Sequence, residues 1–228
     1  MNLKLNKLHN LDCMEGMRDI PDKFFELAIV DPPYGSDSEK NELGCHFNGR
    51  GRGAKYKIER IGGTWQKKYE GKINHWDIAP SQKYFDELFR VSKNQIIFGG
   101  NYFALPQTRC FIVWDKKQHE NFTMAMAEYA WTSFNENAKI FRHVPRGTAQ
   151  EPRFHPTQKP VALYEWLLNK YAKPGDKILD THVGSASSLI ACHKLGFQFL
   201  GFELDETYFR LATDRLNKAK AQVSLFDR

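Results

Sequence analysis

Short uninterrupted apolar segments alternate along this chain with segments of helical periodicity, and this alternation constrains the fold more than any other feature. Three of the apolar segments read LAIV, IIF and FIVW, without the regular polar residues of a strand that faces water on one side. Strands of this kind are buried on both faces and therefore need helices above and below them. The sequence predicts an α/β fold rather than a β-sandwich or a helical bundle.

The pattern places seven strands and five helices. We expect the strands at residues 7–11, 26–30, 95–98, 110–114, 128–132, 177–179 and 197–202. We expect the helices at residues 14–20, 81–91, 161–172, 187–195 and 206–219.

A chain of 228 residues suffices for one well-buried core, so we expect a single domain over residues 1–228. Two stretches interrupt the alternation. Residues 36–76 are rich in glycine and basic side chains and are interpreted as an insertion or loop, and residues 135–154 form a shorter basic connection, a candidate recognition loop. Each follows the carboxyl end of a predicted strand, where open α/β sheets build their binding sites.

The net charge of +6 is concentrated in one segment. Residues 49–72 contain eight basic and two acidic side chains, whereas the rest of the chain contains 25 of each. The basic residues of this segment are Arg50, Arg52, Lys55, Lys57, Arg60, Lys67, Lys68 and Lys72. Such a local excess indicates an anionic partner at one place on the protein.

Neither a membrane span nor a metal site is expected. The apolar runs are too short to cross a bilayer and the first residues lack the hydrophobic stretch of a secretion signal, so we expect a cytoplasmic protein. The four cysteines, Cys13, Cys45, Cys110 and Cys192, are widely separated and show no C-x-x-C spacing. We therefore expect free thiols rather than a zinc site or disulfides.

The segment Asp31-Pro32-Pro33-Tyr34 directly follows the strand LAIV. Its two prolines fix φ and remove two backbone donors, which makes a stiff turn whose carbonyl groups are free to accept hydrogen bonds. The carboxylate and the ring on either side can present acceptors to an exocyclic amino group and a face to a planar base. The alternative is that this segment only ends a strand.

A second motif lies at residues 178–188, where a strand runs into a turn of small residues and then a helix. Backbone N–H groups in such a turn can approach a ligand closely, especially around Gly184 and Ser185. Glu203 lies 23 residues after Asp180, at the end of the next predicted strand. Folds of this type place an acid there to bind ribose hydroxyls.

Two further segments carry weaker signals. The first, His155-Pro-Thr-Gln-Lys-Pro160, precedes an amphipathic helix and includes Thr157 and Lys159, although it also reads as an ordinary helix entry. In the second, Asp12 and Cys13 close the first predicted strand, where the aspartate could be no more than a helix N-cap.

Together, and in this order, these motifs closely resemble the S-adenosylmethionine-dependent DNA amino-methyltransferases of the permuted beta class. In that family the catalytic motif precedes the cofactor loop, and the resemblance covers residues 8–216 apart from the insertion. It implies a Rossmann-like class I methyltransferase fold, with a mixed seven-stranded sheet, one antiparallel strand and helices on both faces. It also implies methyl transfer to N6 of adenine, the usual target when aspartate begins the catalytic motif, with S-adenosylhomocysteine as the product.

The resemblance assigns roles to individual residues. Asp31 and the carbonyl group of Pro32 would hold the target amino group, Pro33 would complete the rigid turn, and Tyr34 would stack on the extruded base. The residues assigned to the cofactor are Asp12 near its adenine, Glu203 at its ribose, Asp180, Gly184 and Ser185 along its methionine part, and Thr157 and Lys159 in the segment over its carboxylate, together with Cys13 and His182. No metal is implied.

The cofactor loop departs from the family pattern Asp-Pro-Phe-x-Gly-Ser-Gly-Thr. Thr181, His182, Ala186 and Ser187 replace the proline, the phenylalanine, the second glycine and the threonine. Because S-adenosylmethionine has no pyrophosphate, a loop with fewer glycines can still bind it. We expect an altered affinity rather than a loss of binding.

The resemblance makes DNA the anionic partner, with Arg50, Arg52, Lys55, Lys57, Arg60, Lys67 and Lys68 as its predicted contacts. The sequence does not decide whether the protein forms a homodimer or has a companion restriction nuclease. Two alternative functions also remain: methylation of cytosine at N4, and DNA binding without catalysis. A protein-glutamine methyltransferase is disfavoured, because that family has asparagine before Pro-Pro-Tyr and places its cofactor loop first.

Overall fold

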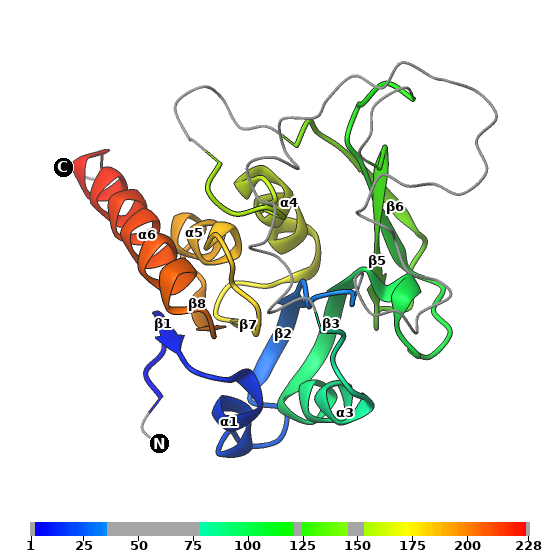
Figure 1. Ribbon diagram of the computed structural model, residues 1–228, viewed down its shortest axis with the longest axis horizontal. Helices are drawn as coiled ribbons and strands as arrows, with labels where there is room; N and C mark the ends of the chain where they lie inside the picture. Colours follow the sequence, from blue (N-terminus) through cyan, green and yellow to red (C-terminus); the bar gives the residue numbers. More distant parts are fainter. Residues whose placement is uncertain (1–2, 36–77, 121–124, 146–152, 227–228) are drawn as a thin grey trace.

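The computed structural model describes residues 3–35, 78–120, 125–145 and 153–226, with the backbone alone for residues 223–226 (Figure 1). The strands are β1 (Lys7–Asn10), β2 (Phe25–Val30), β3 (Ser92–Phe98), β4 (Phe111–Asp115), β5 (Ala127–Thr132), β6 (Lys139–Arg142), β7 (Lys177–Asp180) and β8 (Gln198–Glu203). The helices are α1 (Cys13–Arg18), α3 (Gln82–Val91), α4 (Val161–Tyr171), α5 (Ser187–Lys194) and α6 (Glu206–Phe226), with a 3-10 turn at Gly100–Tyr102. The predicted α/β fold is confirmed.

The strands form one mixed sheet in the order β1-β8-β7-β2-β3-β5-β4-β6. Strand β5 runs antiparallel to both of its neighbours, and the other described pairs are parallel. A single antiparallel strand in this part of the chain agrees with the expected methyltransferase sheet.

Among the described residues the sheet has eight strands rather than the expected seven, because β6 forms within the stretch predicted to be irregular. It pairs parallel with β4 and forms the edge of the sheet, with Val113 opposite Ile140. Its sequence, KIFR, is short, and the Ile140 side chain is largely exposed, so the strand carries little local signal. Pairing with β4, rather than an apolar run, creates this strand.

Helices cover both faces of the sheet (Figure 1). Side chains of α4, α5 and α6 pack with Leu27 and Ile29 in one core cluster, whereas side chains of α1 and α3 pack with Ala28 and Val30 in the other. Successive residues of β2 therefore point to opposite cores, which explains why its sequence is apolar without interruption. None of the helices in the described part of the chain is long and apolar enough to cross a membrane.

The strand order reverses between β7 and β2. From β7 the chain passes through α5 to β8 on one side, and from β2 it passes through α3 to β3 on the other side. In open α/β sheets the crevice at the carboxyl ends of two such strands is the usual ligand site. The two strongest sequence motifs follow these two strands.

Candidate active site

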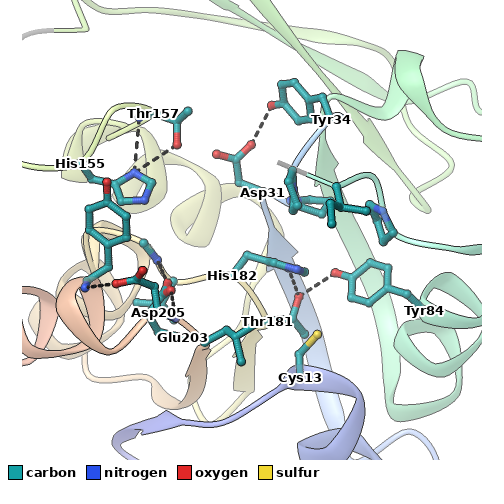
Figure 2. Close-up of a pocket in the computed structure, with 18 of the residues that line it drawn as sticks. Cys13, Asp31, Tyr34, Tyr84, His155, Thr157, Thr181, His182, Glu203 and Asp205 are labelled. Atoms are coloured by element: carbon teal, nitrogen blue, oxygen red, sulfur yellow. Dashed lines mark hydrogen bonds between the residues drawn. The ribbon is translucent and has the colours of Figure 1, made fainter. Parts of the chain in front are cut away.

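A cavity of about 580 Å³ opens at the carboxyl ends of β7 and β2 (Figure 2). It brings together the predicted catalytic and cofactor residues apart from Asp180. Those that line it are Asp12, Cys13, Asp31, Pro32, Pro33, Tyr34, Thr157, Lys159, His182, Gly184, Ser185 and Glu203. Segments that are more than 100 residues apart in the chain therefore share one site.

The catalytic turn is held by an aromatic wall. The hydroxyl group of Tyr34 donates a hydrogen bond of 2.7 Å to Oδ1 of Asp31, and burial raises the pKa of Tyr34 well above its usual value. The Tyr34 ring stacks on Tyr102, with 5.0 Å between ring centroids. Gly99, at φ +66°, leaves room for it, because a Cβ atom there would lie 2.2 Å from the ring. The phenol thus stays protonated and its ring has a fixed position.

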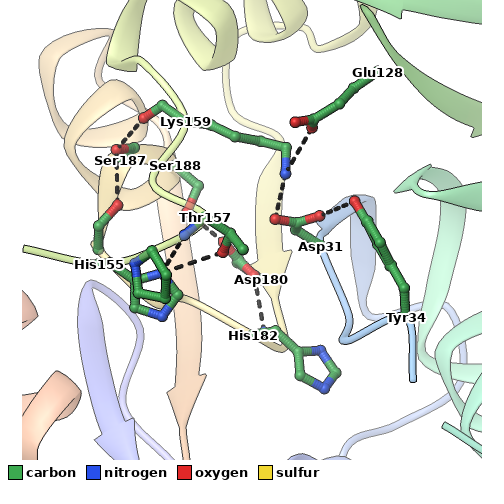
Figure 3. A network of polar contacts seen from close by, with 12 residues as sticks. Asp31, Tyr34, Glu128, His155, Thr157, Lys159, Asp180, His182, Ser187 and Ser188 are labelled. Carbon is green, nitrogen blue, oxygen red and sulfur yellow. Dashed lines mark hydrogen bonds and ion pairs between the residues drawn. The ribbon is translucent and has the colours of Figure 1, made fainter. Parts of the chain in front are cut away.

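Lys159 points toward the catalytic turn (Figure 3). Its ammonium group forms an ion pair with Oδ2 of Asp31 and lies 3.1 Å from Oε2 of Glu128 on β5. Glu128 also lies 2.7 Å from Lys116, and both lysine side chains are buried, with 3% and 6% exposed. The sequence assigned Lys159 to the segment over the cofactor carboxylate, and it did not indicate Glu128, whose position depends on how β5 pairs in the sheet.

The charged groups of this cluster shift one another's pKa values. Burial raises the pKa of Glu128, but Lys159 and Lys116 outweigh burial and hold that pKa at about 2. Burial raises the pKa of Asp31, Lys159 opposes that shift, and Glu128 adds to it. The two carboxylates raise the pKa of Lys159 against the effect of its burial, so Lys159 remains an ammonium ion.

Asp180 lies beneath the cofactor loop instead of lining the cavity. Its side chain is almost fully buried, and it accepts hydrogen bonds from the backbone N–H of His182 at 3.0 Å and from the hydroxyl group of Ser188. Burial raises the pKa of Asp180 to about 7. Both carboxylate oxygens are engaged by the loop itself, so Asp180 shapes the loop, and its contact with the cofactor stays a prediction.

Polar side chains take the place of the Pro-Phe pair in this loop. The hydroxyl groups of Tyr84 and Thr181 are 2.6 Å apart, and Oγ1 of Thr181 lies 2.9 Å from Nδ1 of His182 (Figure 2). Burial lowers the pKa of His182 to about 4, so its imidazole is neutral near pH 7. Tyr84 comes from α3, and no local signal in the sequence links it to this loop.

Glu203 ties the end of β8 to the cofactor loop. Its carboxylate accepts hydrogen bonds from the backbone N–H groups of Gly184 at 2.8 Å and of Asp205 at 3.0 Å. Gly184 has φ +54°, and a Cβ atom there would lie 3.2 Å from the ring of His155. With Asp12, which also caps α1, Glu203 and Asp205 give this end of the cavity three carboxylates.

The segment before α4 is docked onto the same loop. The hydroxyl group of Ser187 donates to the carbonyl group of Lys159 at 2.7 Å, and the His155 ring packs against Tyr208 of α6. Thr157 donates its backbone N–H to Nδ1 of His155 and faces the cavity. These contacts close the cavity on the side of α6.

The predicted DNA contacts Arg50, Arg52, Lys55, Lys57, Arg60, Lys67 and Lys68 lie outside the described residues. Within residues 3–35, 78–120, 125–145 and 153–226, no group of three or more histidine, cysteine or acidic side chains is arranged to hold a metal ion.

Comparison with known proteins identifies a matching family model and similar methyltransferases. A family model described as DNA methylase matches residues 108–214. The Type II methyltransferase M.HpaI of Haemophilus parainfluenzae is 38% identical over 242 aligned residues, which cover 90% of this chain and 72% of that protein. M2.LlaDCHI of Lactococcus lactis subsp. cremoris is 39% identical over 64 residues, and that match spans about a quarter of the relative, 24%.

Solved structures share the fold. The M1.HpyAVI complex with S-adenosylmethionine superposes with a TM-score of 0.51 at 19% identity, over 92% of this chain and 98% of that one. The cytosine-N4-specific PvuII DNA methyltransferase superposes with a TM-score of 0.57 at 11% identity, over 97% and 93%. The S-adenosylmethionine-dependent methyltransferase fold is therefore confirmed. Because the likeness to M.HpaI extends over most of both proteins, the chain belongs to the N6/N4 DNA methylase family.

Proposed function

We propose that this protein transfers a methyl group from S-adenosylmethionine to N6 of adenine in DNA. The observation that carries the proposal is the position of Asp31. Its carboxylate and the Pro32-Pro33-Tyr34 turn line the same cavity as the cofactor loop. An acceptor for an amino group and a ligand pocket thus share one space.

The chemistry of the cavity fits S-adenosylmethionine. Asp12, Glu203 and Asp205 offer carboxylates to ribose hydroxyl groups and to an ammonium group, and the loop at Gly184 and Ser185 is made of small residues that a ligand can approach. When bound, the cofactor supplies an electrophilic methyl group on a sulfonium. The carboxylate-rich end also suits its positive charge.

The residues of the catalytic turn fit the demands of the target atom. An exocyclic amino nitrogen is conjugated with its ring and is a poor nucleophile. Acceptance of both of its N–H bonds, by Asp31 and by the carbonyl group of Pro32, would localise the lone pair and orient it. In the free protein the Tyr34 hydroxyl donates to Oδ1 of Asp31, and the amino group would use a remaining lone pair of this carboxylate.

The target base must leave the duplex to reach this cavity. Extrusion costs a few kcal/mol, and stacking on an aromatic ring such as that of Tyr34 returns about 1–3 kcal/mol. The basic segment at residues 49–72 would hold the flanking phosphates. Adenine is favoured over cytosine because aspartate, rather than serine, begins the catalytic motif.

The test is a methylation assay followed by a nucleoside digest. DNA of mixed sequence is incubated with the protein and labelled S-adenosylmethionine, and we expect the label in N6-methyladenine. Asp31→Ala should abolish transfer and leave cofactor binding, measured by calorimetry, largely intact. Asp22→Ala, on the surface aspartate that pairs with Arg90, is the matched control.

Label in N4-methylcytosine would overturn the choice of base. Full activity of Asp31→Ala would overturn the assignment of the site. Cofactor binding without transfer to any base would favour a silent DNA-binding relative.

A further inference from the structure

Lys159 is shared by two carboxylates that come from different parts of the chain. Asp31 follows β2, Glu128 lies on β5, and Lys159 precedes α4, yet the lysine pairs with both acids (Figure 3). The Lys159 side chain is only 3% exposed, so water does not compensate its charge. The catalytic turn therefore includes a buried cation with two anionic partners.

Lys116 completes the cluster. Its ammonium group lies 2.7 Å from Oε1 of Glu128, so two cations and two anions balance one another. Glu128 is thus bound on one oxygen by Lys116 and on the other side by Lys159. It is joined to the Asp31 side chain through Lys159, which pairs with both carboxylates.

The other titratable groups around Asp31 are weak acids or are already engaged. Tyr34 donates to Asp31 from its own turn, and burial raises the pKa values of Tyr84 on α3 and Tyr164 on α4 well above the usual value. Asp180, at the end of β7, is bound by its own loop. Glu128 and Lys159 are therefore the groups that can set the protonation of Asp31.

We propose that Glu128 is a positioning residue for methyl transfer, which keeps Lys159 paired and thereby allows Asp31 to accept the proton that the target amino group releases. The proposal rests on the proposed function, and it goes beyond it by assigning the proton acceptor and the residue that makes it available.

The target nitrogen bonds to the methyl carbon while the bond from that carbon to sulfur breaks, and its electron pair stays on sulfur. The nitrogen is then cationic and loses one proton to the Asp31 carboxylate, regaining the electron pair of that N–H bond. Asp31 later passes the proton to water, and Lys159 keeps its own protons throughout.

Glu128 matters at the moment when Asp31 is neutral. A buried ammonium whose only carboxylate has been protonated is left without a counter-ion, which opposes that protonation. With Glu128 in place, Lys159 remains paired, so a proton on Asp31 is tolerated. Without Glu128, Lys159 would hold Asp31 strongly ionised, and Asp31 would be a weaker base.

The test compares two substitutions that should act in opposite directions. In Glu128→Gln, Lys159 pairs with Asp31 alone and stabilises its ionised form. The acid limb of the profile of kcat against pH should therefore move to lower pH by about one unit. The value of kcat at its optimum should fall about tenfold or more, with KM for DNA unchanged. In Lys116→Met, Glu128 loses one of its two cations and pairs more strongly with Lys159. Lys159 then stabilises the Asp31 carboxylate less, so the acid limb should move to higher pH.

A second measurement does not depend on catalysis. Carbon-13 NMR of the aspartate carboxyl groups, with Asp31 assigned by comparison with Asp31→Asn, gives its titration in the free protein. We expect its midpoint to fall in Glu128→Gln and to rise in Lys116→Met. Glu26→Gln is the matched control, because Glu26 also bridges two lysines, Lys93 and Lys177, but at the opposite end of β2.

Acid limbs and Asp31 midpoints that stay in place in both variants would overturn the inference, as would shifts of both in the same direction. If Glu128→Gln does not fold, the direction of the shift in Lys116→Met decides alone. Absence of methyl transfer by the unmodified protein would instead contradict the proposed function, and the NMR titration would still report on Glu128.

Discussion

The ammonium group of Lys159 forms an ion pair with the carboxylate of Asp31, which lies 128 residues earlier in the chain. The pair joins the segment before α4 to the turn after β2, at the point where the strand order of the sheet reverses. It therefore links the structural stability of the site to the residue that we place in the reaction.

Removal of this cation should destabilise the fold. Lys159→Met leaves Asp31 and Glu128 as buried anions without Lys159, and we expect a loss of about 3–5 kcal/mol in the free energy of unfolding near pH 8. The loss should shrink below pH 5, as the unpaired carboxyl groups take up protons. Urea denaturation at several pH values measures it. Lys93→Met, which removes a half-exposed lysine from a surface ion pair, should cost less than 1 kcal/mol.

A methyl group at Gly99 should displace the Tyr34 ring. The new Cβ atom of Gly99→Ala would lie 2.2 Å from that ring, so we expect methyl transfer to fall about 100-fold, with cofactor affinity unchanged. Gly175→Ala is the control: its φ is also positive, at +90°, but no atom lies within 4 Å of the added group. Equal losses of activity in the two variants would show that backbone strain, and not Tyr34, is responsible.

The hydroxyl group of Tyr84 should contribute to cofactor affinity through the loop. Tyr84→Phe removes the 2.6 Å contact with Thr181, which also contacts His182, and the loss of one buried hydrogen bond costs about 1 kcal/mol. We expect Kd for S-adenosylmethionine to rise about fivefold in calorimetry. Tyr129→Phe, on β5 and outside the cavity, should leave Kd unchanged. An unchanged Kd for Tyr84→Phe would show that the contacts from Tyr84 through Thr181 to His182 do not contribute to cofactor affinity.

Asp180 should make stability fall as the pH rises. Its pKa in the folded protein is about 7, above its usual value of 3.8, so the folded state holds this proton more tightly than the unfolded chain does. Its contribution is fully present below pH 3.8 and is lost as the pH rises through about 7. The advantage of Asp180→Asn over the unmodified protein should therefore grow by up to about 1.4 kcal/mol per pH unit in this range. Urea titrations test this, with the exposed Asp214→Asn as the control and a pH-independent difference as the contrary result.

The basic segment should dominate the salt dependence of DNA binding. Replacement of Arg50, Arg52, Lys55, Lys57, Arg60, Lys67 and Lys68 by glutamine should flatten the plot of log Kd against log salt concentration. Each lost phosphate contact should reduce its slope by about 0.9. Replacement of Lys173 and Lys218, away from the cavity, is the control. A slope that does not change would assign the phosphate contacts to other residues.

Most element positions could be predicted because their signals are local. The predicted helix at residues 161–172 begins at Val161, directly after Pro160, as the structure has it, and the strand LAIV lies within β2. Strand β6 could not be predicted in this way. Its four residues become a strand only because β4 offers an unpaired edge.

The same distinction between local signals and tertiary packing applies to the residues of the site. Asp31 was identified because the turn that follows β2 carries its own chemical pattern, and Glu203 because it ends the next predicted strand 23 residues after Asp180. Tyr84 and Glu128 were missed because each lies within an ordinary element and faces the site only through packing. Asp180 and Lys159 were identified as cofactor residues, and only the structure shows their partners within the protein, which are Ser188 for Asp180 and Asp31 for Lys159.

The sequence by itself determined the α/β class, the bounds of most elements and the motifs at the ends of β2, β7 and β8, because apolar runs, prolines and glycines act over a few residues. Only the tertiary structure decided that Lys159 lies between Asp31 and Glu128. That arrangement depends on β7 pairing beside β2 and on β5 entering the sheet antiparallel beside β3. The first of these pairings joins Leu27 to Ile178, 151 positions apart, and the energy of both pairings comes from packing that no local pattern records.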